Sequence, residues 1–463
     1  MALIRQEANL GGVHFVIIGG GPAGVEAATH AARLGAEVTL IERDIVGGAA
    51  NLWDCIPSKA MIATGGLLAA TRRAERMGLL PISASIDLDS LRDRVQGITQ
   101  KLAKSKLTLL ESQGVRVIEG SGRFISSNEV AAITKSGEVE LTADAVLLST
   151  GSRPRTPEWA TIDRRRVLTT RDAYPPPEIP EHLIVVGSGV TGVEFVHMFR
   201  SFGAKVSLIV SRQQVLPAKD PEVAAALEVD FLESGVKLYK GARAIDVEVS
   251  DDKVTVVCDD QRRITGSHVL FAIGSIPNSD GIGLKEAGVY VDRNGYVPVD
   301  HHCVTNLKHV YAAGDISGKL PLASVASMQG RKVAEHALGL DSRTHRHLDY
   351  EKAASAIFTE PEIADVGLAE AEAFALGRKI RVTKVPFAAN ARALIDGDSR
   401  GFVKIVSDPA TGVVLGGSIV GQNASELISV IALAVTSHLK VNDIVESVLV
   451  HPALAEALAD AAE

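Results

Sequence analysis

The chain has 463 residues, of which 46% are apolar and only 4% aromatic, and its formal net charge is -8. At roughly 150 residues per domain, this length predicts about three domains with room for sizeable cores. Because the chain is acidic and has no block of like charge, we expect no nucleic-acid partner. Three cysteines are too few for a disulfide framework and suit a reducing compartment.

The N-terminal segment carries no charged-then-apolar leader followed by a cleavage site. No apolar run approaches the length of a membrane span. We therefore expect a cytoplasmic protein without stable membrane insertion.

An internal repeat organises the first half of the chain, where residues 15–44 align without a gap on residues 183–212. Each copy consists of an apolar β-branched run, a glycine-rich turn, an amphipathic helix and a second apolar strand. A strand-helix-strand unit of this kind is typical of dinucleotide-binding domains, so the repeat predicts an α/β protein with two Rossmann-like domains.

The glycines of each turn have distinct expected roles. The first permits a tight turn, the second lets the backbone approach a pyrophosphate, and the third lets the helix pack closely on the strand. The phosphates would lie at the helix N-terminus, where unpaired N–H groups and the helix dipole favour negative charge. One such motif could be an ordinary tight turn, whereas two copies in matched context are a strong signal. The glycines are Gly19, Gly21 and Gly24 in the first copy, and Gly187, Gly189 and Gly192 in the second.

The two copies differ at the end of the second strand. Glu42 of the first copy can accept hydrogen bonds from ribose hydroxyls, which suits a dinucleotide without a 2′-phosphate. Its aligned residue is Val210, so the second copy has no carboxylate to repel a 2′-phosphate, and Arg212 could pair with one. Arg212 could equally be a solvated surface charge. We expect the second site to tolerate NADPH without requiring it.

Further turn signals follow short strand-like segments, and among their glycines are Gly151 and Gly274. A proline-rich segment at 175–180 and a polar segment at 341–352 are typical of domain boundaries. Beyond residue 352, strands and then Ala/Leu-rich helices without a phosphate loop indicate a separate α+β domain. The predicted division is 1–155 and 281–345 for the first dinucleotide-binding domain, 156–280 for the second, and 346–463 for the terminal domain.

Together and in this order, the motifs resemble those of the flavin-dependent pyridine nucleotide disulfide oxidoreductases, the family of dihydrolipoyl dehydrogenase, glutathione reductase and soluble transhydrogenase. The resemblance covers essentially the whole chain. It implies that the first repeat binds FAD, that the second binds NAD(P)H, and that the terminal domain forms a homodimer interface. It also implies that Asp315 holds the ribityl chain of FAD and that Ser149, Thr150 and Gly151 close the FAD site.

Residues 47–59 resemble the redox segment of this family except at one position. Where members with a working disulfide carry a second cysteine, this chain has Ala50, with four residues between it and Cys55. Cys55 stands at a helix start near Lys59, a setting that favours a thiolate, although it could also be an inert buried residue. Because neither of the other two cysteines lies in a redox motif, we expect no redox disulfide.

Two charged pairs also match family positions. Lys59 and Glu194 correspond to a pair near flavin N5, where they could stabilise charge on reduced flavin, unless each is a surface residue of its helix. His451 and Glu456 correspond to a pair contributed by the partner subunit, in which the histidine is the acid-base and the glutamate orients it. A histidine before proline could instead be structural.

The redox segment and residues 321–331 resemble those of a bacterial subgroup of NAD(P)H:quinone reductases. We therefore expect electrons to pass from NAD(P)H through flavin to an external acceptor, a quinone, with His451 protonating the reduced acceptor. Val210 and Trp53 also suit a soluble pyridine nucleotide transhydrogenase. A dihydrolipoyl dehydrogenase-like enzyme with a single active cysteine, or a flavoprotein without turnover, are further alternatives.

Three other features predict no site. His301, His302 and Cys303 are adjacent, but side chains on successive residues seldom converge on a metal ion, so we expect no metal site. Cys258 lies in a strand-like run and is expected in a core. The charged amphipathic helix expected at 91–114 is predicted to present a solvated face and no binding role.

Overall fold

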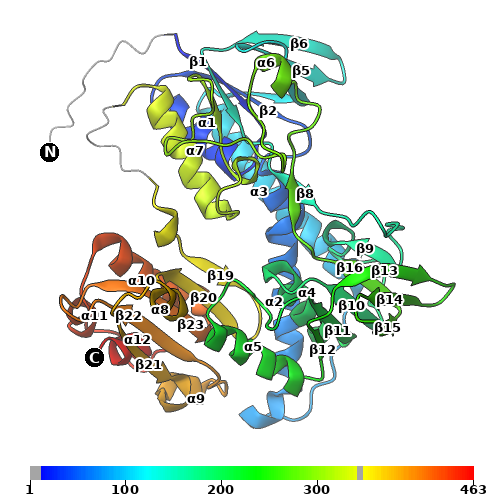
Figure 1. The fold of residues 1–463 in the computed structure, drawn as a ribbon, viewed down its shortest axis with the longest axis vertical. Helices are drawn as coiled ribbons and strands as arrows, with labels where there is room; N and C mark the ends of the chain where they lie inside the picture. The colour runs from blue at the N-terminus through cyan, green and yellow to red at the C-terminus, as the bar shows by residue number, and fades with distance from the viewer. Residues whose placement is uncertain (1–11, 341–347) are drawn as a thin grey trace. The chain divides into compact units, whose positions relative to one another are not determined.

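The computed structural model describes residues 12–340 and 348–463, which form two compact units (Figure 1). The first unit comprises the chain up to Ser58 together with Arg92–Arg153 and Ser275–Tyr350, and the second comprises Lys59–Leu91, Pro154–Gly274 and Glu351–Glu463. The prediction that no leader is present falls partly on residues 1–11. The predicted domain boundary at 341–352 falls mostly on residues 341–347. These two stretches lie outside the described residues.

A five-stranded parallel sheet forms the centre of the first unit, in the order β18-β7-β1-β2-β3. The strand order reverses at β1, and ligands of open α/β sheets bind outside the carboxyl ends of the strands at such a point. The strands are β1 (His14–Ile18), β2 (Glu37–Glu42), β3 (Arg116–Glu119), β7 (Ala145–Leu148) and β18 (Val310–Ala312). Glu42, Ser149 and Gly314 therefore lie at or just beyond the ends of strands at one edge of the sheet.

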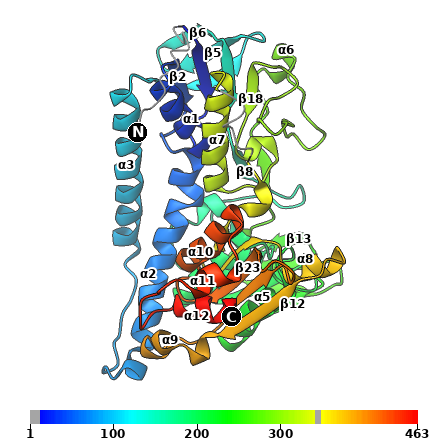
Figure 2. The same cartoon turned by 90° about the vertical axis from the view of Figure 1, so that its left-hand side faces the viewer.

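Two helices cover this sheet and lie side by side, as Figure 2 shows for α1 (Pro22–Arg33) and α7 (Ala323–Ala337). Gly330 of α7 lies so close to α1 that a Cβ there would stand 2.1 Å from the carbonyl oxygen of Ala23. Small residues are required at this crossing because the helix backbones nearly touch. The alanine-rich core between them holds the N-terminus of α1 firmly in place.

The second unit repeats the arrangement in a parallel sheet of order β12-β11-β10-β16-β9. The register also repeats, because His14 of β1 lies opposite Glu37 of β2 and His182 of β10 lies opposite Lys205 of β11. Helix α4 (Val190–Ser201) takes the place of α1. The predicted strand-helix-strand repeat is confirmed. The strands are β9 (Val167–Thr169), β10 (His182–Val186), β11 (Lys205–Val210), β12 (Lys237–Lys240) and β16 (His268–Phe271).

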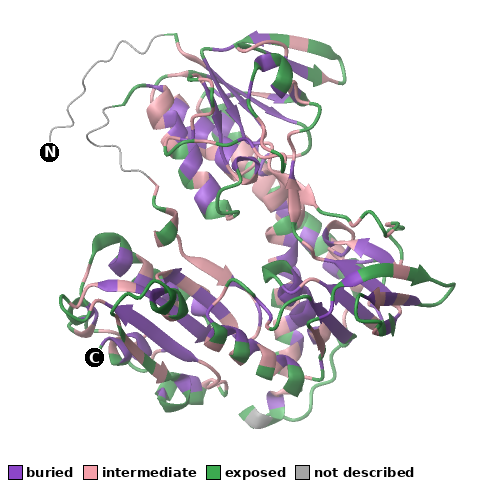
Figure 3. Ribbon diagram, in the orientation of Figure 1, coloured by how far each residue is buried: buried purple, intermediate pink, exposed green. Residues whose placement is uncertain are grey.

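A five-stranded antiparallel sheet of order β19-β20-β23-β22-β21 also belongs to the second unit. Its central strands are buried, as the purple colour in Figure 3 shows, and α10 (Ala424–Ser437) packs against them. The predicted strands and helices of this region are confirmed. The last helix, α12 (Glu456–Ala462), is shorter at its N-terminus than the Ala-rich run predicts. The residues before it form a turn, in which the N–H of Ala453 donates a hydrogen bond to the Glu456 carboxylate.

The remaining elements complete the two units, and the division between the units falls within α2 and α3. No helix of residues 12–340 and 348–463 is long and apolar enough to cross a membrane. The remaining helices are α2 (Ile56–Arg72), α3 (Leu88–Ser112), α5 (Pro221–Glu233), α6 (Leu284–Ala287), α8 (Glu370–Ala375), α9 (Ala391–Ile395) and α11 (Val441–Val445). The remaining strands are β4 (Ser121–Phe124), β5 (Glu129–Thr134), β6 (Gly137–Thr142), β8 (Ser152–Pro154), β13 (Ala244–Val249), β14 (Val254–Cys258), β15 (Arg263–Gly266), β17 (Ser275–Pro277), β19 (Ser355–Ile357), β20 (Glu362–Gly367), β21 (Arg381–Pro386), β22 (Phe402–Ser407) and β23 (Val414–Gly421).

Candidate functional site

The glycine turn between β1 and α1 contains two glycines that the fold requires and one that it does not. Gly19 has φ +107°, and a Cβ there would lie 2.4 Å from the carbonyl oxygen of Ser149. At Gly24 a Cβ would lie 2.0 Å from the carbonyl oxygen of Gly19. Gly21, by contrast, has φ -70°, and a Cβ there would meet no atom within 4 Å. Neither backbone conformation nor packing explains Gly21, so its missing side chain leaves room for a ligand at the N-terminus of α1.

The turn between β10 and α4 divides its glycines in the same way. A Cβ at Gly187, where φ is +111°, would lie 2.3 Å from the carbonyl oxygen of Ala272, and one at Gly192 would lie 1.9 Å from that of Gly187. Gly189 has φ -74° and open space around its expected Cβ. Each turn therefore has one glycine that neither backbone conformation nor packing requires. This arrangement fits two pyrophosphate groups, one at each helix N-terminus.

The carboxylate of Glu42 lies beside the first glycine turn. It is buried, and its oxygens accept the N–H of Gly20 at 2.6 Å and the N–H of Asp44 at 2.8 Å. Burial raises the pKa of Glu42, and the two hydrogen bonds act against that rise. A carboxylate fixed at the end of β2 is placed to accept hydrogen bonds from the hydroxyls of a ribose.

Further predicted residues follow β7 and β18 at the same edge of the first sheet. Thr150 and Asn278 exchange two hydrogen bonds, of 2.8 and 2.9 Å, and Gly151 makes the turn with φ +69°. Ser152 donates a hydrogen bond of 2.5 Å to Asp315, the residue after Gly314 beyond β18. The first unit thus brings Asp315, Thr150 and Gly151 to the edge where the first glycine turn lies.

At the second sheet, the end of β11 differs from the end of β2 as expected. Val210 is fully buried, whereas Arg212 is exposed, and its guanidinium has no hydrogen bond or ion pair within the part of the chain that the structure describes. Gly274 follows β16 with φ +95°, and its carbonyl oxygen accepts the N–H of Arg155. An unpaired guanidinium at this position can bind a 2′-phosphate, and Val210 offers no charge to repel one.

A single π-helical turn, Ala50–Asp54, has Cys55 as its C-cap and is followed by α2 from Ile56. The turn closes with a hydrogen bond of 3.1 Å from the N–H of Cys55 to the carbonyl oxygen of Ala50. This bond places residue 50 one turn from Cys55, and Ala50 has no sulfur with which Cys55 could form a disulfide. Cys55 is half-buried, and none of Cys55, Cys258 and Cys303 forms a disulfide. Single π-helical turns are rare and frequently lie at functional sites.

The π-helical turn is anchored through Asn51, whose side chain is buried. Its Oδ1 accepts a hydrogen bond of 3.2 Å from the ammonium of Lys106 in α3, and its carbonyl oxygen accepts one of 3.2 Å from the hydroxyl of Thr99. Burial lowers the pKa of Lys106, and the negative charge of Cys55 opposes this. The structure therefore places a cation of α3 against the π-helical turn that precedes Cys55.

The predicted amphipathic helix at 91–114 is present and has a solvated face, to which Lys104 belongs, whereas Lys106 lies outside that face. The helix runs from Leu88 to Ser112, and Lys106 is half-buried rather than solvated. A signal in the sequence could have shown this, because Thr99, Lys106 and Leu110 are spaced by seven and four residues and share one face of a helix. A lysine within that buried stripe requires a polar partner.

In the second unit, Lys59 and Glu194 are brought together as expected. The ammonium lies 2.9 Å from Oε2 of Glu194, whose side chain is only 8% exposed. The other carboxylate oxygen accepts the N–H of Phe358 at 3.0 Å, and the Lys59 ammonium lies 4.9 Å from the centre of the Phe358 ring. Phe358 was not predicted, since nothing in its local sequence signals that it holds a pair so remote along the chain.

The predicted C-terminal pair also forms. Nδ1 of His451 lies 2.7 Å from Oε1 of Glu456, while Oε2 accepts the N–H of Ala453 at 2.8 Å. The hydrogen bond from Ala453 and then that from His451 hold the pKa of Glu456 below its usual range. The imidazole is exposed, and with Nδ1 engaged by the carboxylate, Nε2 is the nitrogen that can exchange a proton.

The environments of the three cysteines predict selective alkylation. Burial raises the pKa of Cys303 to about 12 and also raises that of Cys258, so both remain protonated near neutral pH. We expect iodoacetamide to modify Cys55 alone in the native protein, as read by peptide mass spectrometry. The same protein in denaturant should be modified at all three positions. Native modification of Cys303 at a rate comparable to that of Cys55 would contradict the assigned burial.

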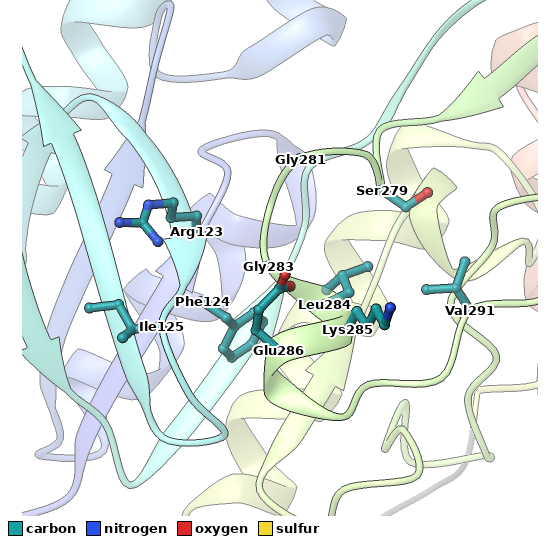
Figure 4. A pocket seen from close by; sticks show the side chains of 10 residues that line it. All are labelled: Arg123, Phe124, Ile125, Ser279, Gly281, Gly283, Leu284, Lys285, Glu286 and Val291. Carbon is teal, nitrogen blue, oxygen red and sulfur yellow. The ribbon is translucent and has the colours of Figure 1, made fainter.

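Two other features lie apart from the predicted residues. A surface pocket of about 470 Å³ in the first unit has Arg123, Phe124 and Lys285 among the residues that line it (Figure 4), and none of the predicted site residues does. His302 stacks on His336 with ring centres 4.4 Å apart. Within residues 12–340 and 348–463, no group of three His, Cys, Asp or Glu side chains is placed to hold a metal ion.

Comparison with known proteins shows which family shares these features. The profile described as pyridine nucleotide-disulphide oxidoreductase matches residues 13–330, and the profile of the dimerisation domain of that family matches residues 353–462. A Mycobacterium tuberculosis protein named NAD(P)H dehydrogenase (quinone) is 42% identical over 459 residues, which cover 96% of this chain and 92% of that protein.

A further relative and a solved structure agree with this assignment. The dihydrolipoyl dehydrogenase of Chlamydia muridarum is 35% identical over 450 residues, covering 96% of this chain and 95% of its own. The crystal structure of LpdA from Mycobacterium tuberculosis superposes with a TM-score of 0.93 at 41% identity, covering 97% of this chain and 99% of that one.

Proposed function

This chain belongs to the pyridine nucleotide-disulphide oxidoreductase family, and on that premise we propose that it transfers electrons from NAD(P)H through FAD to a quinone without a redox disulfide. The observation that carries the proposal is the π-helical turn that joins Ala50 to Cys55 by a backbone hydrogen bond, since Cys55 alone cannot store an electron pair as a disulfide. The 42% identical relative named NAD(P)H dehydrogenase (quinone) supports the choice of acceptor. When bound, FAD supplies the capacity to accept a hydride and to return the electrons to an acceptor.

The residues of the first unit fit FAD. In this proposal the turn at Gly21 receives the pyrophosphate, Glu42 binds the ribose of the adenosine half, and Asp315 binds the ribityl chain. Residues 1–155 and 281–345 would form this FAD domain. Residues 346–463 would form the interface of a homodimer, which the matching dimerisation profile supports.

The residues of the second parallel sheet fit NAD(P)H. The turn at Gly189 receives its pyrophosphate, and the unpaired Arg212 accommodates the 2′-phosphate of NADPH without being needed for NADH. Gly274 lies at the carboxyl end of the neighbouring strand and completes the crevice. Residues 156–280 would form this domain.

Two sets of charged residues act on the electrons and protons. Lys59, fixed by Glu194, presents an ammonium that stabilises negative charge on reduced flavin, and Cys55 contributes a thiolate that remains reduced through the cycle. His451, oriented by Glu456, delivers a proton from Nε2 to the reduced acceptor.

Anaerobic titration of the purified enzyme tests the proposal. We expect the protein to take up two electrons per FAD, because the flavin is the only centre that stores a pair. Rapid quinone reduction and negligible lipoamide reduction should accompany this stoichiometry. Uptake of four electrons per FAD would show a second two-electron centre and would defeat the proposal.

Specific observations favour two rival functions. The absence of a carboxylate at Val210, next to the free Arg212, suits a transhydrogenase that uses both NADH and NADPH. The intact His451–Glu456 pair and the 35% identical dihydrolipoyl dehydrogenase suit thiol chemistry at a single cysteine. Rapid hydride exchange between the two nucleotides would favour the first rival. Loss of thiol-linked turnover in Cys55→Ser with quinone turnover retained would favour the second.

A further inference from the structure

Residues 321–331, which the site described so far does not use, include a buried glutamine. Gln329 is 1% exposed and lies on α7 directly before Gly330, the glycine at the crossing with α1. Burying a side-chain amide is unfavourable unless its oxygen and its nitrogen find hydrogen-bond partners. Both atoms of Gln329 have such partners, and both partners lie outside its own helix.

The side-chain oxygen of Gln329 binds the chain where it leaves the first sheet. The N–H of Ala313 still donates to the carbonyl oxygen of Leu148, at the end of the neighbouring strand β7. The next N–H, that of Gly314, instead donates a hydrogen bond of 2.7 Å to Oε1 of Gln329. Gly314 has φ +73° and ψ -157°, a conformation almost confined to glycine. The hydrogen bond therefore fixes a turn that most other residue types could not make.

This turn carries Asp315, the residue proposed to bind the ribityl chain of FAD. Asp315 follows Gly314 directly and begins a short helical turn, in which the hydroxyl of Ser317 donates a hydrogen bond of 2.7 Å to the carbonyl oxygen of Gly314. The carboxylate of Asp315 accepts a hydrogen bond of 2.5 Å from the hydroxyl of Ser152. Separate contacts therefore fix the two parts of this site, with Ser152 on the carboxylate and Gln329 on the backbone that carries it.

The side-chain nitrogen of Gln329 is bound by Tyr350, the last residue of the first unit. Nε2 donates a hydrogen bond of 2.9 Å to the hydroxyl oxygen of Tyr350, whose side chain is half-buried. With its nitrogen held in this way, the amide keeps Oε1 directed at the N–H of Gly314. Because a hydroxyl group can donate as well as accept, Tyr350 could also bind a carboxylate at position 329.

We propose that Gln329 is a positioning residue for FAD, which fixes the turn at Gly314 so that Asp315 meets the ribityl chain. Tyr350 holds the amide of Gln329 in the orientation that this requires. The inference rests on the proposed function, in which the first unit binds FAD. It concerns the flavin half of the dinucleotide and leaves the glycine turn that receives the pyrophosphate unchanged. Gln329 acts through Gly314 and need not touch FAD.

The rate at which the purified FAD-bound enzyme releases FAD on dilution, followed by the fluorescence of free FAD, tests this role. Gln329→Leu removes both side-chain hydrogen bonds, and we expect it to release FAD about tenfold faster or more. Gln329→Glu retains an acceptor for the N–H of Gly314 and should release FAD at a rate closer to that of the wild type. Tyr350→Phe removes only the hydroxyl group and should accelerate release by about threefold.

Val333→Ala is the matched control for a loss of stability alone. Val333 is fully buried on the same helix and belongs to the core between α7, α1 and the sheet. Shortening it should lower the thermal midpoint and leave the rate of FAD release unchanged. Faster release in Val333→Ala, equal to that in Gln329→Leu, would show that any weakening of α7 releases FAD and would overturn the role of Gln329.

A double-mutant cycle shows whether Gln329 acts through Asp315. In the Asp315→Ala background no carboxylate remains to be positioned, so Gln329→Leu should accelerate release much less than it does in the wild type. Equal acceleration in both backgrounds, or a wild-type rate in Gln329→Leu, would overturn the inference. If Asp315→Ala retains no FAD, the comparison of Gln329→Glu with Gln329→Leu decides the question, and equally fast release by both would overturn it.

These outcomes are independent of the proposed electron acceptor. Release is measured in the resting enzyme and requires neither NAD(P)H nor a quinone. Four-electron uptake by the wild type would therefore defeat the proposed function and leave the release rates unaffected. A wild-type release rate in Gln329→Leu would defeat only the role of Gln329.

Discussion

Replacement of Gly189 by alanine is expected to raise the KM for NAD(P)H by about tenfold or more while the protein remains folded, a loss of about 1.4 kcal/mol of binding free energy. Alanine adopts φ -74° without strain, and its Cβ would meet no atom of the chain within 4 Å. The methyl group would instead occupy the space through which a pyrophosphate reaches the N–H groups of α4. Steady-state kinetics with varied NADH and NADPH, alongside the thermal midpoint, measure both parts of this expectation.

Two matched variants establish that the effect comes from the ligand. Gly192→Ala places a Cβ 1.9 Å from the carbonyl oxygen of Gly187, so we expect it to lower the thermal midpoint clearly. Gly21→Ala is the counterpart of Gly189→Ala in the first turn and should reduce FAD content rather than nucleotide affinity. A wild-type KM in Gly189→Ala, or a loss of stability equal to that of Gly192→Ala, would contradict a ligand-binding role for this turn.

The repeated domains could be predicted because their signals are local. Gly19 and Gly187 each follow an apolar strand and precede an amphipathic helix. The spacing of apolar residues that marks a strand or a helix can be recognised within a short stretch of sequence. The family resemblance, which the matching profiles confirm, rests on the same motifs. The prediction of the two charged pairs depended on the family resemblance, because nothing in the sequence around Lys59 indicates that Glu194 lies beside it.

Partners contributed by remote segments could not be predicted. Lys404, 2% exposed in β22, is surrounded by carboxylates from α5 and α8, with Glu222 at 2.6 Å and Glu370 at 2.8 Å. A lysine in a strand is expected to face solvent, and only the fold shows the carboxylates that compensate its burial. The role of Phe358 could not be predicted either. Its backbone N–H donates a hydrogen bond to Glu194, and every residue type except proline has such a group.

In the redox segment, some properties can be predicted from the sequence and others depend on the fold. The sequence predicts from Ala50 that no disulfide forms, but it does not predict the π-helical turn that precedes Cys55. The turn is anchored at Asn51, whose side-chain oxygen accepts a hydrogen bond from Lys106 and whose backbone carbonyl accepts one from Thr99, both in α3. Because these contacts join segments distant in the chain, the electrostatic environment of Cys55 emerges only from the fold.

Replacement of Glu194 by alanine is expected to slow flavin reduction by NAD(P)H by about 10–100-fold, the scale of a misplaced catalytic group. The carboxylate is the anion that fixes Lys59, at 2.9 Å, and it is bound in turn by the N–H of Phe358. Without it the ammonium is free to move and the Phe358 N–H loses its acceptor, which also costs stability. Stopped-flow absorbance of the flavin measures the rate. The potential of bound FAD should become more positive, because an ammonium without its counter-ion favours the reduced, anionic flavin.

Glu194→Gln separates position from charge in this pair. Glutamine retains an oxygen for the N–H of Phe358 but cannot neutralise Lys59. We expect it to keep the thermal midpoint close to that of the wild type while shifting the FAD potential in the same direction as the alanine variant. Flavin reduction at the wild-type rate in both variants would show that the Lys59–Glu194 pair only stabilises the fold. A potential shift in the alanine variant alone would mean that the position of Lys59, rather than the charge of Glu194, governs the flavin.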